Sequence, residues 1–148
     1  MVVRTTSFIL VSSLSVALSC AVGCGPGTER VRVAGQVLID GKPVTKGEIT
    51  VAPAGKRAAF GTIDSEGRFT LTTYEPGDGT TLGTHSVAVH SGEFLDPMHK
   101  MWNVPKKYAN LATSGLSLNV DGPTDSAVIN LSWDGGKPFV ETIQQGKE

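Results

Sequence analysis

The chain has 148 residues, with 13 lysines and arginines against 14 aspartates and glutamates, so its formal net charge at pH 7 is −1. A nucleic-acid-binding protein needs a basic face, so this balance gives no reason to expect a nucleic-acid partner. The length fits one domain with a core of its own. The two cysteines, Cys20 and Cys24, lie close together near the amino terminus, so the chain that follows them can form no internal disulfide.

The first residues have the pattern of a bacterial export signal. Arg4 precedes an apolar run from Phe8 to Leu18, and small residues follow that run. The run is too short to cross a bilayer as a permanent helix. We therefore expect residues 1–23 to be a signal peptide that is removed, and the mature protein to be exported.

The sequence Ala21-Val22-Gly23-Cys24 resembles the lipobox of bacterial lipoproteins. The resemblance implies cleavage before Cys24, lipidation of its thiol, and a tether over residues 24–30 that holds the protein at a membrane. Because Gly25 and not aspartate follows the cysteine, it also implies the outer membrane if the cell has one. Two or more acyl chains make such an anchor stable. Cys20 is a weaker candidate for lipidation, and an ordinary signal peptide with two incidental cysteines is the alternative.

From residue 31 onward the chain falls into short runs of β-branched residues that alternate with period two. Gly, Pro, Asp or Asn bounds each run, which is typical of a sandwich or barrel. We predict an all-β fold in which residues 31–148 form a single antiparallel seven-stranded sandwich. The expected strands are 30–40, 48–52, 58–63, 68–72, 83–90, 116–120 and 127–133.

Glycines and aspartates between these runs predict the turns. Gly35 interrupts the first strand, where it indicates a bulge or a close approach of another backbone. Asp40 and Gly41 offer the positive φ angles of a tight hairpin turn. In the turn from Asp64 to Gly67, Asp64 can cap backbone amides, and Gly67 takes a conformation that side chains disfavour.

Residues 91–114 form a long segment without the alternation, and long loops usually carry function or hide a small element. Asp96-Pro97 indicates a helix start, with the aspartate as cap and the proline in the first turn. Met98, Met101 and Trp102 would then share one face of a short helical turn. We expect this turn to fold over the open end of the sandwich. An exposed turn would instead be an apolar patch for a partner.

Three stretches stand out as motifs: Val33-Ala34-Gly35-Gln36-Val37, Asp40-Gly41-Lys42-Pro43-Val44 and Gly61-Thr62-Ile63-Asp64-Ser65-Glu66-Gly67-Arg68-Phe69. Together they resemble the carboxypeptidase regulatory-like domain, a transthyretin-like, seven-stranded sandwich, over residues 31–90. Residues 104–110 and 113–116 are similar to a segment of small envelope lipoproteins built on that domain. The resemblance implies an architecture similar to transthyretin and immunoglobulin domains. It implies little chemistry, because the family supports folding, contacts or glycan binding beside other domains.

The sequence offers no catalytic or metal-binding constellation. His85, His90 and His99 are the only candidates for acid-base work near neutral pH. The first two are an odd number of positions apart, so one strand points them to opposite faces. Calcium could be ligated by the acidic turns around Asp64 and Asp78, but backbone capping explains both more simply. With no nucleophile elbow and no phosphate-binding glycine loop, we expect no enzyme activity, cofactor or metal.

Aromatic residues are the remaining candidates for ligand binding. Phe94, Trp102 and Tyr108 could stack on a sugar ring or on a peptide, although Tyr108 also fits the anchor of a strand start. Trp133 has the parity of a core residue. The basic pairs Lys56-Arg57 and Lys106-Lys107 are interpreted as solvated loop charges.

We expect a non-enzymatic lipoprotein with a structural, adhesion or assembly role at the cell envelope. Its partners would be the membrane, through the anchor, and an envelope protein or a glycan. The alternative is a glycan- or peptide-binding module that uses residues 94–108. The exposure of Trp102 separates the two, because a buried indole favours the structural role and an exposed indole favours binding.

Overall fold

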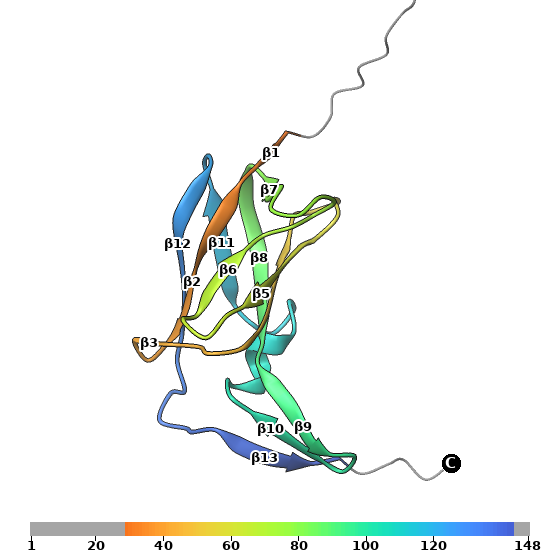
Figure 1. The fold of residues 1–148 in the computed structure, drawn as a ribbon, viewed down its shortest axis with the longest axis vertical. Coiled ribbons are helices and arrows are strands. Elements are labelled where there is room, and N and C mark those ends of the chain that lie inside the picture. Colours follow the sequence, from red (N-terminus) through yellow and green to blue (C-terminus); the bar gives the residue numbers. More distant parts are fainter. Residues whose placement is uncertain (1–28, 144–148) are drawn as a thin grey trace, which may run out of the picture.

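The computed structural model describes residues 29–143, which consist almost entirely of β-strands and connecting turns (Figure 1). The all-β prediction is therefore confirmed. The predicted signal peptide (1–23), Cys24 and the tether up to residue 28 lie outside the described residues. In the part of the chain that the structure describes, no helix is long and apolar enough to cross a membrane.

The described strands are short and numerous, and one 3₁₀ helix, η1, lies among them. Their bounds are β1 Arg30–Val31, β2 Val33–Ile39, β3 Lys42–Pro43, β4 Gly47–Ala52, β5 Ala59–Ile63, β6 Arg68–Thr70, β7 Thr80–Thr81, β8 Gly83–His90, β9 Gly92–Asp96, β10 His99–Trp102, η1 Lys106–Ala109, β11 Leu116–Val120, β12 Thr124–Leu131 and β13 Phe139–Thr142.

Two sheets pack face to face and form what we call the main body (Figure 1). One sheet has the antiparallel order β11-β8-β4-β5, and in the other β2 pairs with β12, β3 and β6. The alternating apolar side chains of both sheets meet between them, because burial of one face of each strand is what stabilises the pair. The fully buried members of this core include Val33, Val37, Ile49, Val51, Leu71, Val87, Val89 and Val120.

One strand pair is parallel, although the sequence predicted an antiparallel sandwich. β12 lies parallel to β2, with Ala127 opposite Gly35 and Leu131 opposite Ile39. The prediction of a purely antiparallel sandwich is wrong here, because the alternation of side chains is the same in both directions and does not encode strand direction. The close approach predicted at Gly35 is confirmed: a Cβ atom at this position would lie 2.0 Å from the Ala127 carbonyl oxygen.

A third sheet, of order β13-β10-β9, projects from the end of the main body opposite β1 (Figure 1). We call it the distal sheet. Its strands were not predicted, and the helix start at Asp96-Pro97 is wrong, because Pro97 and Met98 form the turn between β9 and β10. Asp96 does accept a hydrogen bond from the Met98 amide, at 2.8 Å. The same cap satisfies the first amides of a turn and of a helix, which is why the pattern was ambiguous. The helical turn of this segment is η1.

The predicted turn residues hold the β2–β3 and β5–β6 connections. Asp40 and Gly41 have φ angles of 47° and 78°, as a two-residue hairpin turn with two positive φ angles requires. Asp64 Oδ1 accepts two backbone N–H groups, both at 2.8 Å. Gly67 has a φ of 78°, and a Cβ atom there would lie 2.9 Å from the Val37 carbonyl oxygen.

Candidate functional site

The three aromatic residues singled out for ligand binding are not gathered into one site. Phe94 on β9 is 65% exposed, whereas Trp102 on β10 is only 6% exposed. Both lie on the same face of the distal sheet, because Phe94 pairs with Lys100, two residues before Trp102. Tyr108 lies on η1, is buried, and bonds to Ser132 after the end of β12.

Polar side chains enclose the indole of Trp102. Lys100 Nζ lies 4.0 Å from its ring centroid, and the His90 ring stands edge-on at 5.3 Å. Trp102 Nε1 donates a 2.8 Å hydrogen bond to Glu141 on β13, which also accepts from Lys106 at 2.6 Å. The indole thus fastens β10 to β13, and its ring is not a free platform for a sugar.

The surroundings of Trp102 shift the pKa values of two titratable groups, Glu141 and His90. Hydrogen bonds from Lys106 and Trp102 hold the pKa of the Glu141 carboxyl below its usual range. Burial, together with the nearby Lys100 ammonium, lowers the pKa of His90. A neutral His90 can accept a hydrogen bond from Lys100, whose Nζ lies 2.9 Å from His90 Nε2.

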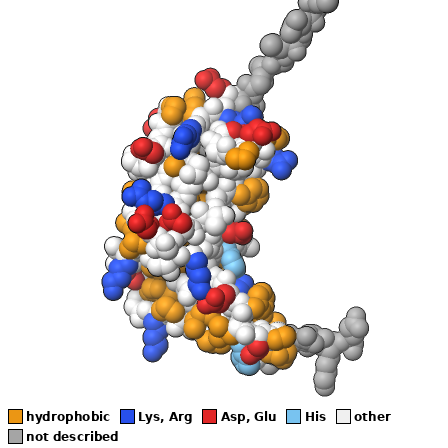
Figure 2. Space-filling model, viewed as in Figure 1, with side chains coloured by type: hydrophobic (Ala, Val, Ile, Leu, Met, Phe, Trp, Pro, Cys, Tyr) orange, Lys and Arg blue, Asp and Glu red, His pale blue; other side chains and the backbone are white. Residues whose placement is uncertain are grey.

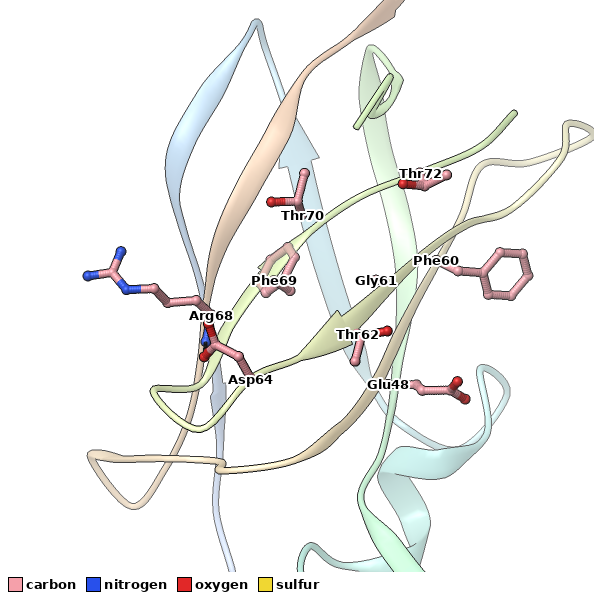
Figure 3. A pocket seen from close by; sticks show the side chains of 9 residues that line it. All are labelled: Glu48, Phe60, Gly61, Thr62, Asp64, Arg68, Phe69, Thr70 and Thr72. Atoms are coloured by element: carbon pink, nitrogen blue, oxygen red, sulfur yellow. Dashed lines mark hydrogen bonds between the residues drawn. The ribbon is translucent and has the colours of Figure 1, made fainter. Parts of the chain in front are cut away.

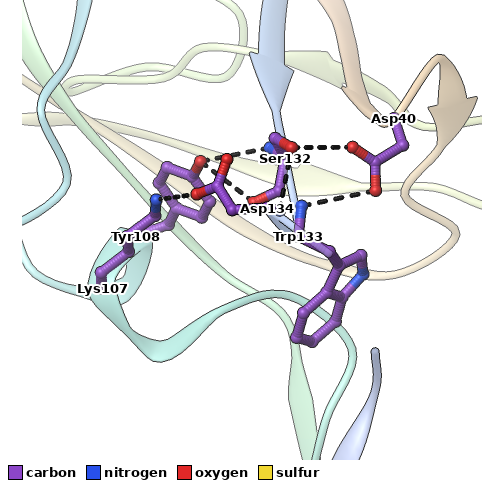
Figure 4. A network of polar contacts seen from close by, with 6 residues as sticks. All are labelled: Asp40, Lys107, Tyr108, Ser132, Trp133 and Asp134. Atoms are coloured by element: carbon purple, nitrogen blue, oxygen red, sulfur yellow. Dashed lines mark hydrogen bonds and ion pairs between the residues drawn. The ribbon is translucent and has the colours of Figure 1, made fainter. Parts of the chain in front are cut away.

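Tyr108 joins η1 to the end of β12 (Figure 4). Its hydroxyl donates to the Ser132 carbonyl at 3.2 Å and accepts from the Ser132 amide at 3.1 Å. The Ser132 hydroxyl donates to Asp40 at 2.9 Å, and Lys107 forms a 2.7 Å ion pair with Asp134. Both hydrogen-bonding functions of the Tyr108 hydroxyl are used within the fold, which agrees with an anchoring role for this residue.

Trp133 is not the core residue that its parity predicted. β12 ends at Leu131, so the alternation stops two residues before Trp133, and its side chain is half-buried at the junction between the main body and the distal sheet (Figure 4). Its amide donates to Asp40 at 3.3 Å. The backbone of Trp133 therefore contributes to the junction, while its indole stays partly accessible.

The distal sheet carries a concentration of exposed apolar side chains. They lie on both faces of the sheet, since Phe139 pairs with Trp102 on one face and Val140 pairs with Met101 on the other. Figure 2 shows hydrophobic side chains at this lower end of the molecule. Exposed apolar groups gathered in this way mark an interaction surface. The exposed members are Phe94, Leu95, Met98, Phe139 and Val140.

A groove of about 690 Å³ lies where β5 and β6 separate (Figure 3). The two strands are bonded at Phe60 and Thr72, at 2.9 and 2.8 Å, and again near the turn. Between these points, Thr62 and Thr70 form no bridge in the described structure, so the ladder is open. Three threonines, Thr62, Thr70 and Thr72, line the groove together with the charged residues Glu48, Asp64 and Arg68.

The candidate metal ligands Asp64, Asp78 and His85 each make a contact within the fold, although His85 Nδ1 is buried without a partner among the described residues. Asp64 caps its turn, and Asp78 pairs with Arg30 at 2.9 Å. His85 Nε2 lies 2.6 Å from the Thr81 carbonyl oxygen. Among residues 29–143, no three His, Cys, Asp or Glu side chains lie close enough together to hold a metal ion.

Sequence analysis missed the part that β13 plays in this site. Glu141 lies 39 residues from Trp102 along the chain and completes its surroundings from a different strand. No local pattern signals such a contact. Comparison of the chain with family models, with curated proteins and with solved structures finds no match. The functional argument therefore depends on the residues and their geometry.

Proposed function

We propose that this protein is an exported, lipid-anchored envelope protein that acts without catalysis, in structure, adhesion or assembly at the membrane surface. In this proposal Cys24 carries the lipid, residues 24–30 form the tether, and the domain from residue 31 is a seven-stranded sandwich of the carboxypeptidase regulatory-like type, to which the distal sheet is added. The distal sheet binds a partner protein in the envelope.

The exposed apolar side chains of the distal sheet are the observation that carries this proposal. Half of the ten large hydrophobic residues that are exposed in the described chain lie on it. The sheet projects from the end opposite β1, which follows directly on the proposed tether (Figure 1). An anchored protein would thus present this surface away from its own membrane. The indole of Trp102 is buried, and a buried indole favours a structural role over ligand binding.

Site-specific photo-cross-linking in intact cells tests the proposal. A photoreactive amino acid replaces Val140 on the distal sheet or, as the control, Val128 on β12; the two are 46% and 49% exposed. We expect a discrete cross-linked envelope protein from position 140 and none from position 128. The matched exposure removes differences in accessibility. Equal capture from both positions, or none from position 140, would contradict a partner at the distal sheet.

A glycan- or peptide-binding role is the second candidate, and one observation favours it. Phe94 is the most exposed of the large hydrophobic side chains described, and Lys100 Nζ lies 5.4 Å from its ring centroid. An exposed ring beside an ammonium group suits a sugar with acidic substituents. Because Lys100 also lies over Trp102, a ligand at Phe94 should change Trp102 fluorescence. The test titrates soluble peptidoglycan fragments, with Phe94→Ala as the variant that should lose the response.

A further inference from the structure

A pocket of about 380 Å³ lies beside β1 and β7, at the end of the molecule that the proposed tether enters. Three of its lining residues are basic, namely Arg30, Lys56 and Arg57, and Tyr74 lies among them. No carboxylate lines it. The pair Lys56-Arg57 was interpreted from the sequence as a solvated charge, but the pairing of β1 with β7 brings a third cation, Arg30, to the same place.

Two guanidinium groups pack against the ring of Tyr74. The Arg30 and Arg57 guanidinium carbons lie 4.8 and 5.0 Å from its ring centroid. Cation–π contacts stabilise each group over the ring, but two like charges that share one ring repel each other. An anion bound in the pocket that both arginines line would offset this positive charge.

The fold neutralises only one of the three cations. Asp78 forms a 2.9 Å ion pair with Arg30. Burial opposes the ionisation of Asp78, but backbone hydrogen bonds, the first from Thr73, and the Arg30 charge outweigh it and lower the pKa of this carboxyl. Within residues 29–143, neither Lys56 nor Arg57 forms an ion pair with a carboxylate. Two positive charges of the pocket are therefore uncompensated.

A buried hydroxyl at the pocket lacks a partner. Thr81 lines the pocket and is only 7% exposed, and its Oγ1 makes no hydrogen bond within the described residues. Thr80 Oγ1 is unpartnered in the same way, and both hydroxyl oxygens have almost no accessible surface, so the two cations without an ion pair, and not this hydroxyl, are what points to an anionic ligand. A phosphate group has several acceptor oxygens, and guanidinium groups bind it through paired N–H donors.

The pocket also lies close to the proposed anchor. Six residues lead from Cys24 to Arg30, and an extended chain of that length spans at most about 20 Å. If Cys24 is lipidated, the pocket stays within reach of the lipid headgroups. Each basic side chain near an anionic membrane surface contributes about 1 kcal/mol to binding.

We propose that this pocket binds a phosphate group, and that in the anchored protein this phosphate belongs to an anionic lipid headgroup. The second half rests on the proposed lipid anchor, whereas the first half does not. Arg57 and Lys56 neutralise the phosphate, Arg30 is shared between it and Asp78, and Tyr74 keeps the two guanidinium groups in place.

Vesicle flotation tests the proposal with the expected mature chain, residues 24–148, carrying Cys24→Ser, so that neither an acyl chain nor the apolar run from Phe8 to Leu18 contributes to binding. Vesicles contain phosphatidylcholine alone, or phosphatidylcholine with phosphatidylglycerol, whose phosphate is not shielded by a headgroup ammonium. The pocket variant combines Lys56→Gln with Arg57→Gln. The control combines Lys42→Gln with Lys137→Gln, two exposed lysines outside the pocket, and removes the same charge.

We expect binding to the anionic vesicles only, reduced about tenfold or more in the pocket variant and less than about twofold in the control. A second measurement follows the backbone amides of Gly55 and Tyr74 by NMR as inorganic phosphate is added. Amide shifts without vesicle binding would keep the phosphate site and overturn the lipid as its source. No response in either measurement, or equal losses in both variants, would overturn the site. An unmodified Cys24 in the native protein would refute the anchor and leave these outcomes unchanged.

Discussion

Phe69 and Phe60 show how the parity of a single residue decides what it contributes. Phe69 lies at the centre of β6 and points into the core between the two sheets, where it is 3% exposed. Phe60 on β5 points outward beside the open groove and is 53% exposed (Figure 3). The same side chain is therefore part of the core at one position and a surface feature at the other.

Replacing Phe69 with alanine should lower the free energy of unfolding by about 3 to 5 kcal/mol, because it removes a buried ring and leaves a cavity. Phe60→Ala should change it by no more than about 0.5 kcal/mol, as for an exposed position. Denaturant unfolding of both variants measures the difference. A loss of only a few tenths for Phe69→Ala would mean that β6 does not pack as described.

For single residues, the sequence predicted the burial of core side chains well but did not predict the surroundings of the candidate site residues. Val33, Val37 and Phe69 are buried as their alternation indicated. Trp102 and Tyr108 could not be placed in this way, because their surroundings come from Glu141 and Ser132, which are distant in the chain. Aromatic residues satisfied by distant polar partners have no local signature.

Among the elements, β13 shows most clearly how a charged side chain can help to hold a strand. It lies at the edge of the distal sheet, and its outward residues include Phe139 and Val140. The hydrogen bond from Trp102 and the ion pair with Lys106 both end on its Glu141 carboxylate. The backbone ladder with β10 holds β13 in place, and the ionised Glu141 adds side-chain contacts to it.

The distal sheet should loosen in acid. The pKa of Glu141 is lower in the folded protein than in the unfolded chain, so its contribution to stability is complete above the unfolded value, about 4.3 for a glutamate, and is lost as the pH falls through the lower, folded value. With Trp133→Phe in the background, emission from Trp102 should move to longer wavelength over that range. The same titration of Glu141→Gln should show no such step; a step that persists would assign it to another group.

The strands of the main body were predictable because they alternate, whereas those of the distal sheet were not. In β9, the four residues that follow Gly92 are all exposed. The strand therefore lacks the alternation of buried and exposed residues by which a strand is predicted. β7 and β3 are two residues long and are defined by their partners. The direction of β12 relative to β2 could not be predicted either, because the alternation of side chains is the same in parallel and antiparallel strands.

For the whole molecule, the proposed anchor and the distal sheet set an orientation. β1 and the basic pocket lie at one end, and the distal sheet, which carries half of the exposed large hydrophobic residues described, lies at the other (Figure 1). Lipidation at Cys24 would place the first end against the bilayer. The distal sheet would then point toward whatever the protein holds.

If Cys24 carries the lipid as proposed, replacing it with serine should move most of the protein from the membrane fraction to the soluble fraction, because the acyl chains would supply more membrane affinity than the basic pocket. Cys20→Ser is the matched control and should leave the protein in the membrane fraction. Fractionation of cells that express each variant, followed by immunoblotting, provides the measurement. Unchanged retention of Cys24→Ser, or release of Cys20→Ser, would count against lipidation at Cys24.

The parallel pairing of β2 with β12 has a consequence for biogenesis. Asp40 at the end of β2 reaches the amide of a residue 93 positions later, so the first long strand has no complete set of neighbours until nearly all of the chain has been synthesised. Contacts of such high sequence separation form slowly. A newly made chain would therefore stay unfolded long enough to pass through a translocation channel. Truncation before β12 would leave an open strand edge that is prone to aggregation.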